Sequence, residues 1–332
     1  MRIYDVQRTR TTLHRAVRGR EGGDGGASTG STPDPVPDLL GAVTPFLAVV
    51  AVLGVSAAGP LMAATAAPAF AIAFWRNAAA TLLIAPVVVA RSRTELGRLG
   101  RSHWLATALA GAALAGHFAT WVSSLKLTSV AAATALVSTA VVWVVLYDVL
   151  RGDRLPKAVV AGGLLAVAGV LVVTGVDFTL SLRALAGDAL AVAGGFFAAV
   201  YLVAGQSVRT RLSTTGYTFA CYGTCAVILG VLCVVTGTEL TGFSARTWML
   251  IAAVTLLAQF LGHSLVNHLL AVMSPTVISL LLLLEVPGAA LLAGVFLGQS
   301  PALGVYAGLL LILVGLAVVT SHRPPPAPMN AD

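Results

Sequence analysis

The chain has 332 residues, of which 58% are hydrophobic and 10% are charged, and its formal net charge is +7. Ordinary soluble domains are about 45–50% apolar and about 25% charged, so this composition excludes that class. The positive charge could indicate a nucleic-acid partner, but we expect none, because the basic residues are sorted by membrane side as described below.

The chain is expected to begin with a disordered cytoplasmic tail, residues 1–40. This stretch holds glycine pairs and three prolines and cannot bury a core. No apolar segment follows its basic start until about residue 43, so we expect no cleaved signal peptide. Residues 321–332, with a run of three prolines, are predicted to be a second disordered tail.

Between the tails, ten apolar segments follow one another, each long enough to cross a hydrocarbon core of ~30 Å as a helix. They lie at about 43–62, 68–90, 104–125, 128–150, 158–175, 185–206, 217–236, 248–271, 276–298 and 302–320. None shows the alternation of a barrel strand, and backbone polar groups must be satisfied inside the bilayer. The sequence therefore predicts an all-α polytopic membrane protein with ten transmembrane helices.

The basic residues indicate the orientation of these helices. With both termini in the cytoplasm, sixteen Lys and Arg residues fall on the cytoplasmic side. Only Lys126, Arg183 and Arg246 fall on the other side, and Arg76 lies inside a segment. By the positive-inside rule we expect a multi-pass protein of the plasma or inner membrane with cytoplasmic termini. Lys126 and Arg246 are expected to be solvated surface charges.

Two stretches that lie 146 positions apart are nearly the same: Gly116-His117 in the third segment and Gly262-His263 in the eighth. The same offset relates Gly152-Asp153 to Gly298-Gln299 at the ends of the fourth and ninth segments. This pattern indicates a duplication, with a first five-helix repeat at 41–175 and a second at 183–320. Because five crossings is an odd number, the second repeat must enter from the opposite side, which predicts inverted repeats typical of secondary transporters.

Several short motifs occur together at matching helix positions. They are Phe74-Trp75-Arg76, His117-Phe118 with Trp121, Gly262-His263-Ser264 with Asn267, Ser274-Pro275-Thr276 and Glu285-Val286-Pro287. With these motifs the chain resembles the EamA-type branch of the drug/metabolite transporter superfamily over residues 43–320. The resemblance implies a carrier of amino acids or other small metabolites, mostly an exporter or exchanger, without indicating the cargo.

The chain departs from that family's pattern at two places. Asp153 and Gln299 stand where the family commonly has the glutamate of a Leu-Gly-Glu ending. Val141, the counterpart of Pro287, stands where the fourth helix often has a proline. Both departures weaken residue-level mechanisms carried over from relatives, but not the expected fold.

Glu285 is the main candidate for proton coupling. It lies about nine residues into the ninth segment, between leucines and Val286-Pro287. A carboxylate at this depth costs a few kcal/mol, so it should face the interior, be paired or be protonated. The alternative is a structural acid that caps the backbone left open by Pro287.

The third and eighth segments supply the candidate substrate-binding residues. Gln259, His263 and Asn267 follow one another at intervals of four and should share one helix face. His117 and Trp121 are the matching candidates in the third segment. The alternative for the histidines is a hydrogen-bonded structural role, and for Trp121 it is helix packing. No carboxylate or cysteine accompanies the two histidines at a metal-ligand spacing, so we expect no metal and no cofactor.

Arg76, in the second segment, completes the candidate set. It could bind a substrate carboxylate or pair with Glu285, and the alternative is that its long side chain reaches toward the outer interface.

These features predict a secondary active transporter of a small polar or amphipathic compound, working by alternating access, with a proton as the candidate coupling ion. A passive channel or a lipid scramblase is the alternative from another class. We expect no enzyme, because the chain lacks paired aspartates, a His-Glu-x-x-His motif and a serine–histidine dyad at a credible spacing. The expected partners are the small-molecule substrate, the lipid bilayer and protons.

Overall fold

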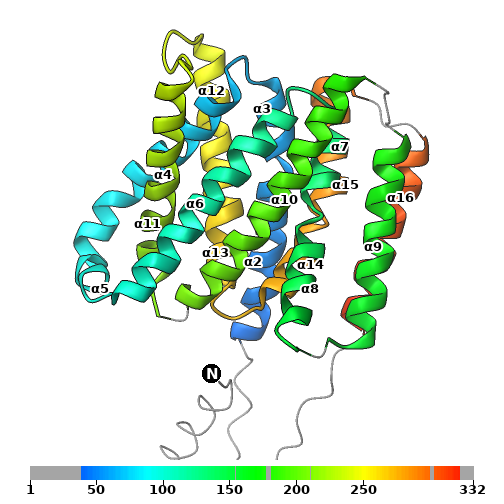
Figure 1. Cartoon of the computed structure of the whole chain (residues 1–332), viewed down its shortest axis with the longest axis horizontal. Coiled ribbons are helices and arrows are strands. Elements are labelled where there is room, and N and C mark those ends of the chain that lie inside the picture. Colours follow the sequence, from blue (N-terminus) through cyan, green and yellow to red (C-terminus); the bar gives the residue numbers. More distant parts are fainter. Residues whose placement is uncertain (1–38, 154, 177–180, 210, 300–302, 322–332) are drawn as a thin grey trace, which may run out of the picture. The chain divides into compact units, whose positions relative to one another are not determined.

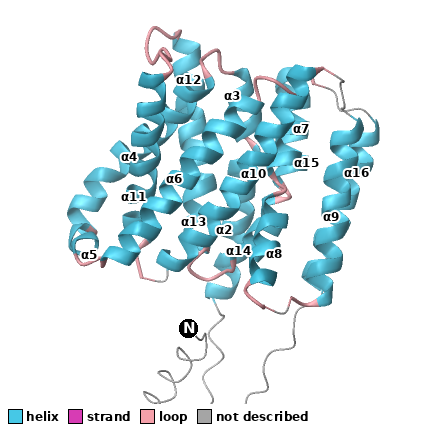
Figure 2. Ribbon diagram, in the orientation of Figure 1, coloured by secondary structure: helices cyan, strands magenta, loops and turns pink. Residues whose placement is uncertain are grey.

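The computed structural model describes residues 39–153, 155–176, 181–209, 211–299 and 303–321. Most of the two predicted tails, residues 1–38 and 322–332, lies outside the described residues. Every regular element in the described ranges is helical, and these ranges contain no strand (Figure 2). The all-α class is therefore as predicted, because helices satisfy their backbone hydrogen bonds within one segment.

The described residues of the first repeat form eight helices. They are α2 (Leu39–Ser56), α3 (Ala58–Ala64), α4 (Ala69–Arg91), α5 (Arg93–Gly97), α6 (Arg101–Ser124), α7 (Val130–Val137), α8 (Ala140–Leu150) and α9 (Lys157–Val176). The second repeat contains a π-helical segment within its third crossing. Its elements are α10 (Leu182–Arg209), α11 (Thr214–Val235), α12 (Ala245–Ala253), the π-helical segment Val254–Ser264, α13 (Leu265–Leu269), α14 (Pro275–Leu282), α15 (Glu285–Leu297) and α16 (Leu303–Ser321).

Eight helical stretches of the described chain are long and apolar enough to cross a membrane. They correspond to the first four and to the sixth to ninth predicted segments. The other two predicted segments correspond to α9, of 20 residues, and to α16, of 19 residues, in which the apolar stretches Lys157–Val172 and Tyr306–Val318 are found. Ten complete crossings therefore remain a prediction.

The two repeats run in opposite senses. Figure 1 shows α2 rising from the lower edge of the helical unit, whereas α10, which begins the second repeat, descends toward it. α9 rises and α16 descends beside it, and these two helices pack closely along their length. α4 packs on α11 and α6 packs on α10, so each of these contacts joins one repeat to the other.

The contact between α9 and α16 preserves the 146-residue offset in three dimensions. A Cβ atom on Gly169 would lie 2.5 Å from the carbonyl oxygen of Gly308 and 2.9 Å from Ile312. A Cβ atom on Gly315 would lie 2.5 Å from the carbonyl oxygen of Gly162 and 2.8 Å from the amide nitrogen of Ala166. Each residue of the second contact lies 146 positions from a residue of the first contact. The same contact is therefore formed twice, once with the residues of each repeat in the opposite role. Small residues permit this approach of backbones in lipid.

The fourth helix of each repeat is interrupted at the same depth. α7 ends at Val137 and α8 begins at Ala140, while α14 ends at Leu282 and α15 begins at Glu285. In the second repeat Pro287 has no N–H for the carbonyl of Leu283, which instead accepts from the Val286 amide at 3.2 Å.

The first repeat reaches the same break without a proline. The hydroxyl of Ser138 donates to the Thr134 carbonyl at 2.8 Å, and that of Thr139 donates to the Leu136 carbonyl at 2.6 Å. Such side-chain bonds to the preceding turn compete with the helical pattern and bend helices. Both broken helices end in a glycine of positive φ, Gly152 at 83° and Gly298 at 64°, where a side chain would be strained.

Lys126 differs from the expected surface charge. Its ammonium group donates to the carbonyls of Met62 at 3.0 Å and Thr65 at 2.7 Å, at the carboxyl end of α3. A cation at a helix end satisfies carbonyls that have no intrahelical partner. Partial burial lowers the pKa of Lys126. The sequence did not indicate this contact, because it depends on the packing of the turn before α7 against α3.

We predict that close packing of α9 and α16 limits the stability of the protein. Gly169→Ala places a methyl group against backbone atoms and should destabilise the fold by about 1–3 kcal/mol, the usual cost of overpacking. Thermal unfolding of the detergent-solubilised protein measures the effect. Gly163→Ala on the same helix is the matched control, because a Cβ there meets nothing within 4 Å. Equal stability of the two variants would contradict the packing described here.

Candidate functional site

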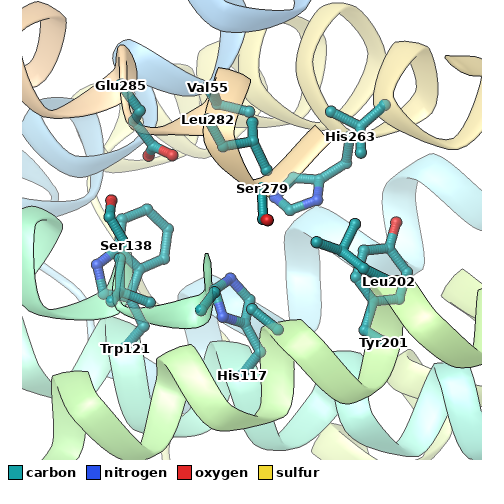
Figure 3. A pocket seen from close by; sticks show the side chains of 14 residues that line it. Val55, His117, Trp121, Ser138, Tyr201, Leu202, His263, Ser279, Leu282 and Glu285 are labelled. Carbon is teal, nitrogen blue, oxygen red and sulfur yellow. The ribbon is translucent and has the colours of Figure 1, made fainter. Parts of the chain in front are cut away.

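A small cavity lies where helices of the two repeats meet. The first repeat contributes side chains from α2, α6, α7 and α8, and the second from α10, the π-helical segment, α13, α14 and α15. The lining residues are Val55, His117, Trp121, Val137, Ser138, Ala140, Ala198, Tyr201, Leu202, His263, Val266, Ser279, Leu282 and Glu285 (Figure 3). Both helix breaks border the cavity, through Ser138 and Glu285.

The cavity has a volume of about 50 Å³. A water molecule needs roughly 10–15 Å³ of such space, whereas small-molecule sites span about 300–1,000 Å³. The cavity therefore has room for a few water molecules in the described conformation. A metabolite would fit only after the surrounding helices move apart.

Glu285 is the first residue of α15, and its carboxylate points into the cavity on the side of Ser138 and Trp121 (Figure 3). The residue is 9% exposed. In the described part of the chain its carboxylate makes no hydrogen bond and no ion pair, with Arg76 or any other residue. A negative charge is favoured at the amino end of a helix, which partly offsets the missing partner.

His117 projects from α6 toward the cavity and is held by α10. Its Nδ1 lies 3.0 Å from the carbonyl oxygen of Gly194. Because a carbonyl can only accept, Nδ1 carries the hydrogen, and Nε2 of the neutral ring is an acceptor. The ring stacks on that of Trp121, with centroids 5.5 Å apart and planes 23° apart. The indole N–H of Trp121 is buried and has no partner among the described residues.

His263, the duplicate of His117, reaches the same cavity from the second repeat. The centroids of the two imidazole rings are 6.1 Å apart, and the centroid of the Phe118 ring lies 5.2 Å from that of His263. Nδ1 of His263 is buried and has no hydrogen-bond partner in the described chain. The fold thus brings together His117, His263, Trp121 and Glu285 from the predicted site.

Gln259 and Arg76 do not line the cavity. Gln259 is fully buried, where its Oε1 accepts from Nε of Arg76 at 2.8 Å and its Nε2 donates to Asn77 at 3.0 Å. The guanidinium of Arg76 lies 4.1 Å from the centre of the Phe118 ring, which is a cation–π contact. Arg76 is 0% exposed, and its Nη2 has no hydrogen-bond partner in the described ranges. Arg76 therefore does not reach the outer interface.

Asn267 also lies behind the cavity wall. Its side-chain oxygen accepts from the hydroxyl of Tyr201, and its Nδ2 donates to Tyr222 at 3.4 Å. The Tyr222 hydroxyl lies 3.1 Å from that of Ser264. Because Tyr201 lines the cavity, Asn267 acts on the site through this tyrosine.

The predicted polar stripe on the eighth helix is divided between the cavity and the contacts behind its wall. Gln259 and His263 lie inside the π-helical segment, and the hydroxyl of Ser264 donates to the carbonyl of Gln259, five residues earlier, at 3.0 Å. Only His263 of the three predicted residues lines the cavity.

The sequence prediction missed Tyr201, Ser138 and Ser279 among the polar residues of the lining. A tyrosine within a long apolar segment is the signal that could have singled out Tyr201. Ser138 lines the site because α7 ends there, and no local pattern separates it from the many other small residues. Among the described residues, no group of three or more His, Cys, Asp or Glu side chains could hold a metal ion.

Comparison with known proteins agrees with this architecture. A search of curated proteins finds no match. Among solved structures, one titled only "Crystal structure of protein" aligns with a TM-score of 0.68 and 21% sequence identity, covering 84% of this chain and 97% of the other. At that identity the likeness concerns the fold alone. A family model described as the EamA-like transporter family matches residues 43–175 and again residues 185–321. Because these two matches cover most of the chain, the protein belongs to the EamA-like transporter family.

Proposed function

We propose that this membrane protein is a secondary active transporter that moves a small polar or amphipathic metabolite, such as an amino acid-like compound, by export or exchange. The observation that carries the proposal is the central cavity, to which both repeats contribute. It holds a carboxylate, an imidazole nitrogen and an indole N–H that lack partners in the described chain. Polar groups left unpaired at this depth are costly, so a ligand or a proton is the natural partner.

His117, His263 and Trp121 are the proposed cargo-contacting residues. The two histidines offer hydrogen-bonding nitrogens from opposite walls, and Trp121 offers a flat apolar surface. Arg76, Gln259 and Asn267 stand behind these walls, so their proposed role is to hold the second and eighth helices and Tyr201 in position.

Alternating access would come from a relative movement of the two repeats. The small volume of the cavity supports this proposal, since a cargo needs the helices to separate. The paired breaks at 138–139 and 283–284 are the places where α8 and α15 could tilt without distorting α7 and α14, because a broken helix lacks a continuous hydrogen-bond ladder.

Glu285 is the proposed proton carrier. A single carboxylate without an ion-pair partner can accept a proton when the cargo leaves and release it when the cargo returns. We also propose the plasma or inner membrane as the location, with both termini in the cytoplasm, because of the distribution of basic residues.

The first prediction concerns cargo binding. Thermal unfolding in detergent, measured with a panel of amino acids, purines, amines and sugars, should reveal a stabilising ligand. At about 100 times its Kd the ligand should stabilise the fold by roughly 2.7 kcal/mol. His263→Ala should lose this stabilisation, whereas His103→Ala, in the first turn of α6 and outside the cavity lining, should retain it. If the ligand stabilised both variants equally, His263 would not be part of the binding site.

The second prediction concerns coupling. In proteoliposomes, Glu285→Gln should abolish accumulation of the identified cargo driven by a pH gradient, because a glutamine cannot carry the proton. Exchange of cargo at equal concentrations should persist. Glu239→Gln, in an exposed loop, is the control for loss of a carboxylate. Accumulation by Glu285→Gln at the wild-type rate would refute the coupling scheme, and flux without saturation or counter-exchange in the wild type would favour a channel.

A further inference from the structure

We propose that the groove between α6, α8 and α10 binds one chain of an anionic phospholipid, whose phosphate is held by Arg151 at the mouth of the groove. This inference is independent of the cargo and of the central cavity. It rests on the shape and position of this groove and on the charge at its mouth.

The groove is apolar and open to the membrane. It has a volume of about 560 Å³, and α6 forms one wall, α8 the other and α10 the floor. The side chains of Leu109, Leu146 and Phe196 line it and are 54%, 44% and 45% exposed. Because these helices belong to membrane-spanning stretches, the exposed side chains face lipid rather than water.

The length of the groove matches one leaflet. Its lining on α10 extends from Phe196 to Ser207, about 16 Å at ~1.5 Å per residue. Half of a hydrocarbon core of ~30 Å is ~15 Å. The inner end is closed by Trp143 and Phe196, whose rings meet edge to face at 5.5 Å. Trp143 follows the break between α7 and α8 by one turn, which places this end at mid-depth.

The mouth of the groove lies where α8 ends, at the lower edge of the helical unit in Figure 1. There Tyr147 and Leu150 form the last part of the wall. Arg151 donates to the hydroxyl of Tyr147 at 2.7 Å, and its guanidinium lies 5.5 Å from the centre of the tyrosine ring. Tyr147 thus fixes an exposed cation beside the groove, and the other two guanidinium nitrogens of Arg151 make no hydrogen bond within the described chain.

Two carboxylates act electrostatically on Arg151, but it forms no ion pair with either of them within the described chain. The carboxylate of Asp148 accepts from the hydroxyl of Thr276 on α14, and it keeps its negative charge. Asp153 lies near Arg151 and reduces the local positive charge. An apolar channel one leaflet long with a cation at its polar end is complementary to a lipid with a negative headgroup.

Native mass spectrometry of the delipidated protein tests this proposal. The protein is titrated with phosphatidylglycerol or phosphatidylcholine that carry the same acyl chains. The wild type should retain one phosphatidylglycerol in preference to phosphatidylcholine. Arg151→Gln should weaken phosphatidylglycerol binding about fivefold, as expected for one surface cation. Arg246→Gln, which removes an exposed arginine from the opposite face, should leave binding unchanged.

A second variant tests the groove itself. Val203→Trp fills its floor and should weaken the binding of both lipids, and Leu146→Trp at the exposed wall serves if the first variant does not fold. Equal retention of both lipids by the wild type, or unchanged binding by Arg151→Gln, would overturn the proposal. It would also fail if the wild type dimerised and the tryptophan variants did not, because a second copy would then occupy the groove, or if the cargo displaced the bound lipid.

Discussion

The hydrocarbon interior of a bilayer offers no water to satisfy a polar group, and this constraint organises the described structure. Backbone groups are satisfied within helices. Where α7 and α14 stop, side-chain hydroxyls or a proline account for the altered hydrogen bonds. Arg76 and Gln259, deep in the helical unit, bond to each other, and Arg76 also stacks on Phe118. Two of the buried polar atoms that lack a hydrogen-bond partner in the described chain, Nε1 of Trp121 and Nδ1 of His263, belong to residues that line the central cavity, where Glu285 also has no partner. These groups together, rather than any single motif, identify the candidate site.

The duplication gives this site its form. Close contacts at Gly169 and Gly315 relate the two repeats by the same offset as His117 and His263. Equivalent residues of two repeats come close together only near the axis that relates the repeats, and the ring centroids of the two histidines are 6.1 Å apart. The repeats are no longer equivalent at the level of chemistry. Glu285 has no acidic counterpart in the first repeat, where Thr139 stands 146 residues earlier, so only one of the two helix breaks carries a carboxylate.

Much of the fold could be predicted from residue patterns, because transmembrane helices are specified by local hydrophobicity. The eight longest spans, the two-repeat organisation and the helical class follow from the apolar segments and the repeated motifs. Of the candidate residues, His117, Trp121, His263 and Glu285 reach the cavity together, whereas Arg76, Gln259 and Asn267 support its walls from behind.

The sequence by itself determined which stretches enter the membrane, where the chain is duplicated, and which polar residues lie at mid-depth. These properties depend on hydrophobicity, spacing and charge, which are local. Only the tertiary structure decided which of those residues face the cavity. Gln259 bonds to Arg76 behind the cavity wall while His263 lines the cavity, the aromatic ring of Phe118 covers Arg76, and Lys126 caps a helix rather than meeting solvent. Each outcome depends on how the helices are rotated and on contacts between distant segments. The periodicity of a single helix specifies neither the rotation nor these contacts.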